Sequence, residues 1–117
     1  MNTFNAMAEV LKREGTEYLF CFPTLDLIEV VAQHGIRPIV CRQERVGMGM
    51  ADAYSRISNG KRIGVFSMQA GPGVENAYPG ITTAYADASP CWCCRPATTA
   101  TVRDGRTFSP LPAGTRT

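Results

Sequence analysis

Histidine and lysine are scarce in this sequence. His34 is the one histidine among 117 residues, so the chain has no pair of imidazoles for a metal site or a proton relay. It stands at the end of a predicted helix, where interaction with the helix dipole outweighs a catalytic role as the explanation. Chemistry that depends on several histidines is therefore excluded.

Long apolar runs and secretion signals are also missing. No stretch reaches the roughly 20 apolar residues of a membrane span, and the N-terminus lacks the charged, apolar and small-residue segments of a signal peptide. The five cysteines then favour a reducing compartment, with Cys21 and Cys41 expected in the core because each lies in an apolar run. We expect no contact with membrane and a cytoplasmic location.

Positive charge is weak and unevenly distributed. The net charge is +2. Residues 1–90 hold eight Lys or Arg against nine Asp or Glu, whereas residues 91–117 hold four Arg against Asp104 alone. A nucleic-acid surface needs basic residues gathered on a folded face together with stacking aromatics. We therefore expect no nucleic-acid partner.

Short apolar runs alternate with segments of helical periodicity. The run at residues 18–22 is apolar at every position, which predicts a strand covered on both faces, as in a parallel sheet. Further strands are predicted at 37–41 and 62–68, and helices at 3–14, 27–34, 44–58 and 74–88. Right-handed crossovers between such strands give an α/β fold, a parallel sheet with helices on both faces.

Glu44 stands at a corner between a strand and a helix. It follows the apolar run that ends at Cys41 and opens a segment in which Val46, Met50, Ala53 and Ile57 recur at helical spacing. Ligands of open α/β sheets bind at the carboxyl ends of strands, so this carboxylate is placed to meet one. Taken alone, the spacing favours the simpler role of complementing the helix dipole.

Four motifs in residues 1–90 carry a resemblance. They are Arg42-x-Glu44 before a helix that ends in Ala53-Tyr54-Ser55-Arg56, then Gly60-Lys61, Gly71-Pro72-Gly73-x-x-Asn76 and Ala84-Tyr85-Ala86-Asp87-Ala88-Ser89-Pro90. Their order and spacing resemble the N-terminal pyrimidine-binding domain of thiamine-diphosphate-dependent enzymes, in the group of acetolactate synthase and sulfoacetaldehyde acetyltransferase. The resemblance implies the thiamine-diphosphate-binding fold, here incomplete.

The resemblance assigns roles to individual residues. The glutamate that matches Glu44 hydrogen-bonds N1′ of the aminopyrimidine ring and favours the tautomer whose exocyclic nitrogen deprotonates thiazolium C2, so Glu44 is the implied catalytic residue. Gly71, Pro72 and Gly73 match the turn that lines the pyrimidine pocket, and Asn76 is expected to fix that turn. Pro23 matches a proline near the ring, although Thr24 replaces the glycine that usually follows. Gln69 is placed to face the substrate.

The diphosphate half of such a site is missing from the sequence. Members of this family hold Mg²⁺ and the diphosphate on a C-terminal domain, commonly of a partner subunit, through a Gly-Asp-Gly motif that this chain lacks. We therefore expect no metal ligands here and Mg²⁺ only through that other domain. The full-length form is expected to be a homo-oligomer such as a dimer, and this chain a truncated fragment.

Residues 91–117 differ in composition from the rest, and we place the end of the domain at residue 90. Cys91-Trp92-Cys93-Cys94 replaces an expected apolar strand, and a shift of one base turns its codons into those of Leu, Val or similar residues. We read residues 91–117 as a frameshifted tail and expect disorder, because it has little apolar material to bury. A metal site at Cys91, Cys93 and Cys94 is the weaker alternative, since no second ligand pair follows.

Three functions remain open at this stage. The leading one is thiamine diphosphate binding by the N-terminal part of an acetolactate synthase-like enzyme that acts on 2-oxo acids or related carbonyl compounds and is inactive alone. The second is a non-catalytic module that associates with an intact paralogue, supported by Met48, Met50, Tyr78 and Tyr85. The third, an unrelated nucleotide-binding domain, lacks the Gly-x-Gly-x-x-Gly fingerprint.

Overall fold

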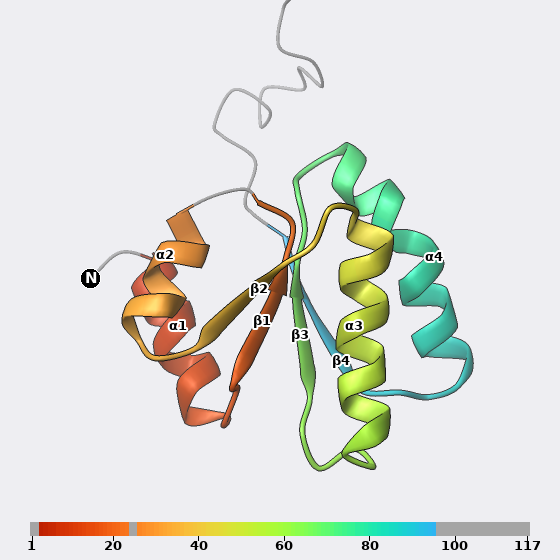
Figure 1. The fold of residues 1–117 in the computed structure, drawn as a ribbon, viewed down its shortest axis with the longest axis horizontal. Helices are drawn as coiled ribbons and strands as arrows, with labels where there is room; N and C mark the ends of the chain where they lie inside the picture. Colours follow the sequence, from red (N-terminus) through yellow and green to blue (C-terminus); the bar gives the residue numbers. More distant parts are fainter. Residues whose placement is uncertain (1–2, 24–25, 96–117) are drawn as a thin grey trace, which may run out of the picture.

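The fold is a four-stranded parallel sheet between two pairs of helices (Figure 1). The computed structural model describes residues 3–23 and 26–95. In chain order the elements are α1 (Thr3–Arg13), β1 (Tyr18–Cys21), α2 (Asp26–Gln33), β2 (Arg37–Val40), α3 (Glu44–Ile57), β3 (Gly64–Ser67), α4 (Pro72–Ala86) and β4 (Cys91–Cys94). The predicted α/β class is confirmed. No described helix is long and apolar enough to cross a membrane.

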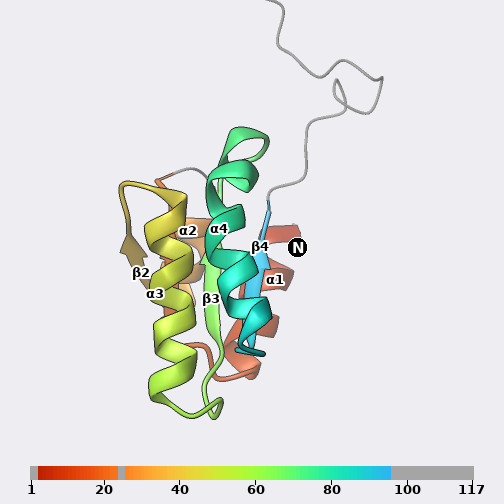
Figure 2. The same ribbon diagram turned by 90° about the vertical axis from the view of Figure 1, so that its right-hand side faces the viewer.

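The strands run in the order β2-β1-β3-β4, so β1 and β3 are central and β2 and β4 form the edges. All pairs are parallel. The helices α1 and α2 cover one face, and α3 and α4 cover the other (Figure 2). Because crossovers return each strand in the same direction, the loops after β1, β2 and β3 all leave from the carboxyl ends of the strands. The N-termini of α3 and α4 therefore meet at this end of the sheet.

Each face of the sheet has its own apolar core. Leu19 and Cys21 of β1 point toward α1 and α2 and join a cluster with Leu11 and Val31. Phe20, between them, points to the opposite face and packs in a cluster with Met48. This alternation explains why β1 is apolar at every position, as a strand buried on both faces requires. The buried positions of Cys21 and Cys41 confirm their predicted place in the core.

Strand β4 corrects the predicted domain boundary. Cys91–Cys94 pairs with β3 from Gly64↔Cys91 to Ser67↔Cys94, and the amide of Met68 donates to the Cys94 carbonyl at 3.1 Å. The prediction of disorder from residue 91 onward is wrong for these four residues, because their backbone pairs with the open edge of β3. Residues 96–117, the rest of the predicted tail, lie outside the described part of the chain.

Three large apolar residues of α3 lie on its outer face, although helical periodicity alone would place them against the sheet. Val46, Met50 and Ile57 predicted the helix correctly, yet they are 47%, 38% and 88% exposed. Gly47 stands where α3 meets the sheet, because a Cβ on Gly47 would overlap the Phe66 ring and the Cys41 sulfur. The close approach of α3 to the sheet thus requires a small residue at this position, while Val46, Met50 and Ile57 stay on the surface.

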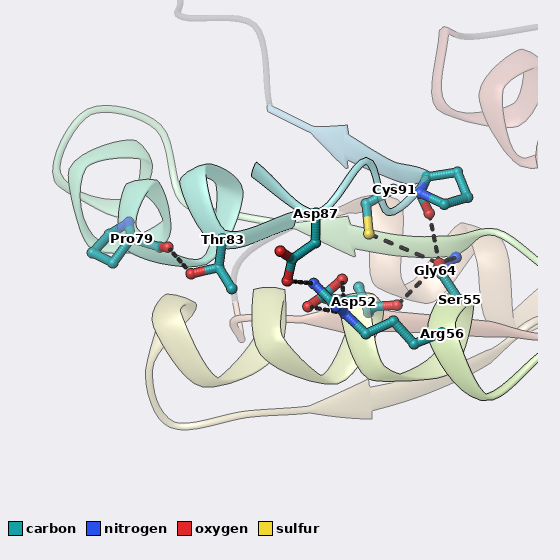
Figure 3. Close-up of polar contacts among 10 residues, drawn as sticks. Asp52, Ser55, Arg56, Gly64, Pro79, Thr83, Asp87 and Cys91 are labelled. Carbon is teal, nitrogen blue, oxygen red and sulfur yellow. Dashed lines mark hydrogen bonds and ion pairs between the residues drawn. The ribbon is translucent and has the colours of Figure 1, made fainter. Parts of the chain in front are cut away.

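Ser55 joins three elements at the end of the sheet opposite the helix N-termini (Figure 3). Its side chain is fully buried. The Oγ atom accepts a hydrogen bond from the Gly64 amide at 2.8 Å and lies 2.6 Å from the Pro90 carbonyl and 3.2 Å from the Ala51 carbonyl. One hydroxyl therefore ties α3 to the first residue of β3 and to the segment that leads into β4.

We expect Ser55→Ala to lower the free energy of unfolding by about 1–3 kcal/mol, because it leaves the buried Gly64 amide without a partner. Urea denaturation followed by circular dichroism measures this. Ser58→Ala is the matched control, since Ser58 makes similar hydrogen bonds to Ser55 and Arg62 nearer the surface. Equal losses in the two variants would contradict the role given to Ser55.

Candidate functional site

Glu44 is the first residue of α3 and is 3% exposed. The preceding Gln43 is the N-cap, with extended backbone angles (φ −144°, ψ 141°) and no capping side-chain bond. The loop from β2 therefore turns directly into the helix and directs the Glu44 carboxylate inward, toward α4. Complementing the helix dipole requires no burial, so the dipole alone does not explain this position.

The Gly71-Pro72-Gly73 segment forms the start of α4. Gly71 is its N-cap and has a φ of 71°, a conformation that glycine adopts readily. Pro72 and Gly73 are already helical, two residues earlier than the predicted start, because proline lacks only an amide that the first turn leaves unpaired. Gly73 is buried, and a Cβ built on it would lie 2.8 Å from Glu44 Oε1. The missing side chain is what lets the carboxylate lie against α4.

Asn76, one turn further along α4, contacts the same carboxylate. Its Nδ2 donates to Glu44 Oε2 at 3.4 Å, a long hydrogen bond. The expected role for Asn76, which is to fix the preceding turn, stays a prediction. Among the described residues, this is the one side-chain hydrogen bond that Glu44 accepts.

A cavity of about 220 Å³ opens beside this contact and is lined by Gln43, Arg45 and Asn76. Gln43 and Arg45 were not predicted as site residues. Their position on either side of Glu44 in the sequence was the available signal. The cavity has polar walls on both helices, so a small polar molecule entering it would reach the region next to Glu44.

The structure places the remaining predicted residues, Pro23 and Gln69, at the same end of the sheet, after the carboxyl ends of β1 and β3. Pro23 lies two residues after Cys21 and Gln69 lies two residues after Ser67, and these two strand ends are paired neighbours. Both side chains are exposed. Gln69 also packs near Gly73, where an added Cβ would lie 2.7 Å from the Gln69 Cβ. Thr24 lies outside the described residues.

The thiols near the site are poor nucleophiles. Burial raises the pKa of Cys41, and the neighbouring Glu44 charge adds to the rise. Burial also raises the pKa of Cys21, to about 11, with a smaller contribution from Cys41. Both thiols therefore stay protonated at neutral pH. The buried Glu44 carboxylate is left as the acidic group next to the cavity.

A protein-family profile identifies the family to which this domain belongs. The profile described as "Thiamine pyrophosphate enzyme, N-terminal TPP binding domain" matches residues 1–94. The chain belongs to this family of thiamine pyrophosphate enzymes. The match ends with the last residue of β4, which agrees with the corrected domain boundary.

Relatives of this thiamine pyrophosphate-binding domain include several large enzyme subunits. The acetolactate synthase large subunit of Haemophilus influenzae is 40% identical over 88 residues, which cover 72% of this chain and 15% of the relative. A probable 2-ketoarginine decarboxylase of Pseudomonas aeruginosa is 36% identical over 88 residues, which cover 73% of this chain and 15% of the relative. The chain thus spans about 15% of the length of these relatives.

Proposed function

We propose that this domain binds the aminopyrimidine ring of thiamine diphosphate, with the Glu44 carboxylate hydrogen-bonded to ring nitrogen N1′. Thiamine diphosphate is the same compound as thiamine pyrophosphate. The observation that carries the proposal is the buried carboxylate of Glu44, which faces the bare Cα of Gly73 and accepts one long hydrogen bond, from Asn76.

The described residues fit such a ligand. A buried carboxylate is costly unless a partner shares its charge or a proton, and a ring nitrogen that receives a proton supplies one. No atom lies within 4 Å of a Cβ built on Gly71, so a flat ring can approach the backbone at the α4 N-terminus there. Asn76 holds one carboxylate oxygen and leaves the other for the ligand. Pro23 is proposed to contact the ring, and Gln69 to face the substrate.

The work of the protein in this proposal is to orient the ring and to hold a proton at N1′. The bound cofactor supplies the electron sink that reactions of 2-oxo acids need. The name of one relative, a probable 2-ketoarginine decarboxylase, supports 2-oxo acids as the substrate class. We propose that Mg²⁺ and the diphosphate are held by a separate domain, in a homo-oligomeric enzyme. In the described residues, no three His, Cys, Asp or Glu side chains converge on a metal position.

All five cysteines lie in the described residues and none forms a disulfide. Free thiols fit the reducing cytoplasm, which we propose as the location. This chain on its own is proposed to bind the cofactor weakly and to be inactive, because the diphosphate supplies much of the polar contact that anchors such a ligand.

A second candidate function is association with an intact paralogous subunit, without catalysis by this chain. The exposed side chains of Met50, Tyr78 and Tyr85 favour it, since these residues are 38%, 62% and 87% exposed. Met48 gives no such support, because it is buried in the core. Co-purification with a larger synthase-like subunit, lost on Tyr78→Ser and Tyr85→Ser substitution, would distinguish this function from cofactor binding.

Titration of the ¹⁵N-labelled chain with thiamine diphosphate tests the leading proposal, because NMR detects weak binding. We expect the amides of Gly73 and Asn76 to shift with ligand concentration. Glu44→Gln keeps the size of the side chain but removes its charge, and we expect it to weaken binding at least about tenfold, as for a hydrogen bond to a charged group.

Glu75→Gln is the matched control, because Glu75 is also a first-turn glutamate but is exposed. It should bind like the unmodified chain. Equal binding by Glu44→Gln and Glu75→Gln would show that Glu44 does not contact the ligand.

A further inference from the structure

A second group of chemically soft side chains lies on the face of the sheet that α3 and α4 cover, beside strand β4. Cys91 and Cys93 are two residues apart on β4, so their side chains point to the same face of the sheet. Both line a cavity of about 170 Å³ between β4 and α4, and Met48 of α3 contributes to its wall. The Cys93 sulfur lies 3.5 Å from the Met48 sulfur.

The third thiol of this segment is excluded from the cavity. Cys94 points to the other face, where it packs in the cluster with Ala8 and Leu11, and Trp92 lies beside Met7 and Val10 on that face. The sequence suggested Cys91, Cys93 and Cys94 as one group. The alternation of the strand separates them and brings the thioether of Met48 to Cys91 and Cys93 instead.

We propose that Cys91, Cys93 and Met48 bind a soft monovalent metal ion, Cu(I) or Ag(I), between α3 and β4. Thiolate and thioether sulfurs select soft ions over Mg²⁺, Ca²⁺ or Mn²⁺. The described lining of the cavity includes the hydroxyl-bearing residues Tyr85 and Ser89 but no carboxylate or imidazole, so its sulfur atoms favour a soft ion over a harder one.

One pair of sulfurs, those of Cys93 and Met48, is already close to the spacing that a shared ion requires. With metal–sulfur bonds of about 2.3 Å, two sulfurs of a trigonal site are about 4 Å apart. The 3.5 Å between Cys93 and Met48 needs only a small outward movement to reach this value. The Cys91 sulfur lies 3.8 Å from Ser55 Oγ, so this side chain must rotate away from that hydroxyl to join the ion. Cys93 is exposed, which gives an ion a route from solvent. Coordination by both thiolates releases two protons per ion.

Competition with a colorimetric Cu(I) chelator under anaerobic, reducing conditions tests the site on the whole chain. We expect one Cu(I) per chain and two protons released. Cys93→Ala should weaken binding by about 100-fold and Met48→Leu by about 10-fold, within the range seen when metal-site residues are changed. Cys94→Ala is the matched control, because its thiol lies on the other face, and it should bind like the unmodified chain.

Two measurements on the unmodified chain avoid dependence on variants that fail to fold. X-ray absorption of the bound ion should show two or three sulfur neighbours. Bound Ag(I) should protect Cys91 and Cys93 from iodoacetamide, as mapped by mass spectrometry, and leave the reactivity of Cys94 unchanged. Fewer than two sulfur neighbours, or equal weakening by Cys94→Ala and Cys93→Ala, would overturn the proposal.

Discussion

Gly64→Ala is expected to remove a large part of the stability of the fold. Gly64 is the first residue of β3, and a Cβ built on it would overlap the carbonyl group of Ala51 in α3 and lie 2.7 Å from the Ala51 Cα. These are backbone atoms, so no side-chain rotation relieves the overlap. Either α3 moves away from the sheet or the strand shifts, and both open the core around Phe66. A loss above about 4 kcal/mol is expected, a large part of the 5–15 kcal/mol that stabilises a typical domain.

Urea denaturation, followed by far-ultraviolet circular dichroism, measures this loss. Gly49→Ala is the control, because Gly49 is an exposed residue of α3 with no atom within 4 Å of its built Cβ. Alanine is favoured over glycine inside a helix by roughly 1 kcal/mol, so this variant should be slightly more stable. If Gly64→Ala unfolds within 1 kcal/mol of the unmodified chain, α3 does not pack on β3 as described.

The order of the elements could be predicted because local signals were strong. Continuous apolar residues in β1 indicated a strand covered on both faces, and helical periodicity indicated α3. The orientation of α3 could not be predicted, because it depends on which side must approach the sheet closely. Gly47 and Ser55 face inward for that reason, while Val46 and Met50 remain exposed. Periodicity predicts a helix and its apolar face, but it does not predict which element that face packs against.

The end of the sheet was missed because its signal is not local. Cys91–Cys94 has no turn residue or alternation that marks a strand, and its unusual composition suggested a boundary at residue 90. The segment becomes a strand because β3 presents a free edge to it, with four residue pairs in register. Ser55 adds to this through its short contact with the Pro90 carbonyl. Both partners are distant in sequence, so composition alone could not reveal them.

The candidate site was predicted from a resemblance, not from spacing. Nothing in the local sequence indicates that Glu44 and Gly73 touch, since this depends on β2 and β3 both being neighbours of β1. The same topology brings Asn76 to the Glu44 carboxylate, 32 residues away in the chain. Roles for Pro23 and Gln69 remain predictions. The contact between Glu44 and Gly73 is therefore the feature of the site that a substitution can test most directly.

Gly73→Ala is expected to abolish detectable thiamine diphosphate binding while the domain stays folded. The new Cβ would lie 2.8 Å from Glu44 Oε1 and 2.7 Å from the Gln69 Cβ. The Glu44 carboxyl oxygen can rotate away, but the Gln69 Cβ can move only with the loop after β3 that carries it. Helix propensity offsets part of the cost. The stability should therefore change by no more than about 1–2 kcal/mol. The carboxylate, however, is pushed out of the position in which it faces the ligand.

The same NMR titration separates these two effects. Gly73→Ala should keep a folded spectrum, with changes confined to residues near Glu44 and Asn76, and should show no shifts with added ligand. Gly49→Ala again serves as the control, because it adds the same methyl group to an exposed face of α3 and should leave binding unchanged. Normal binding by Gly73→Ala would mean that the carboxylate can leave this position without loss. The buried contact between Glu44 and Gly73 would then be a packing feature of the two helices and not part of a ligand site.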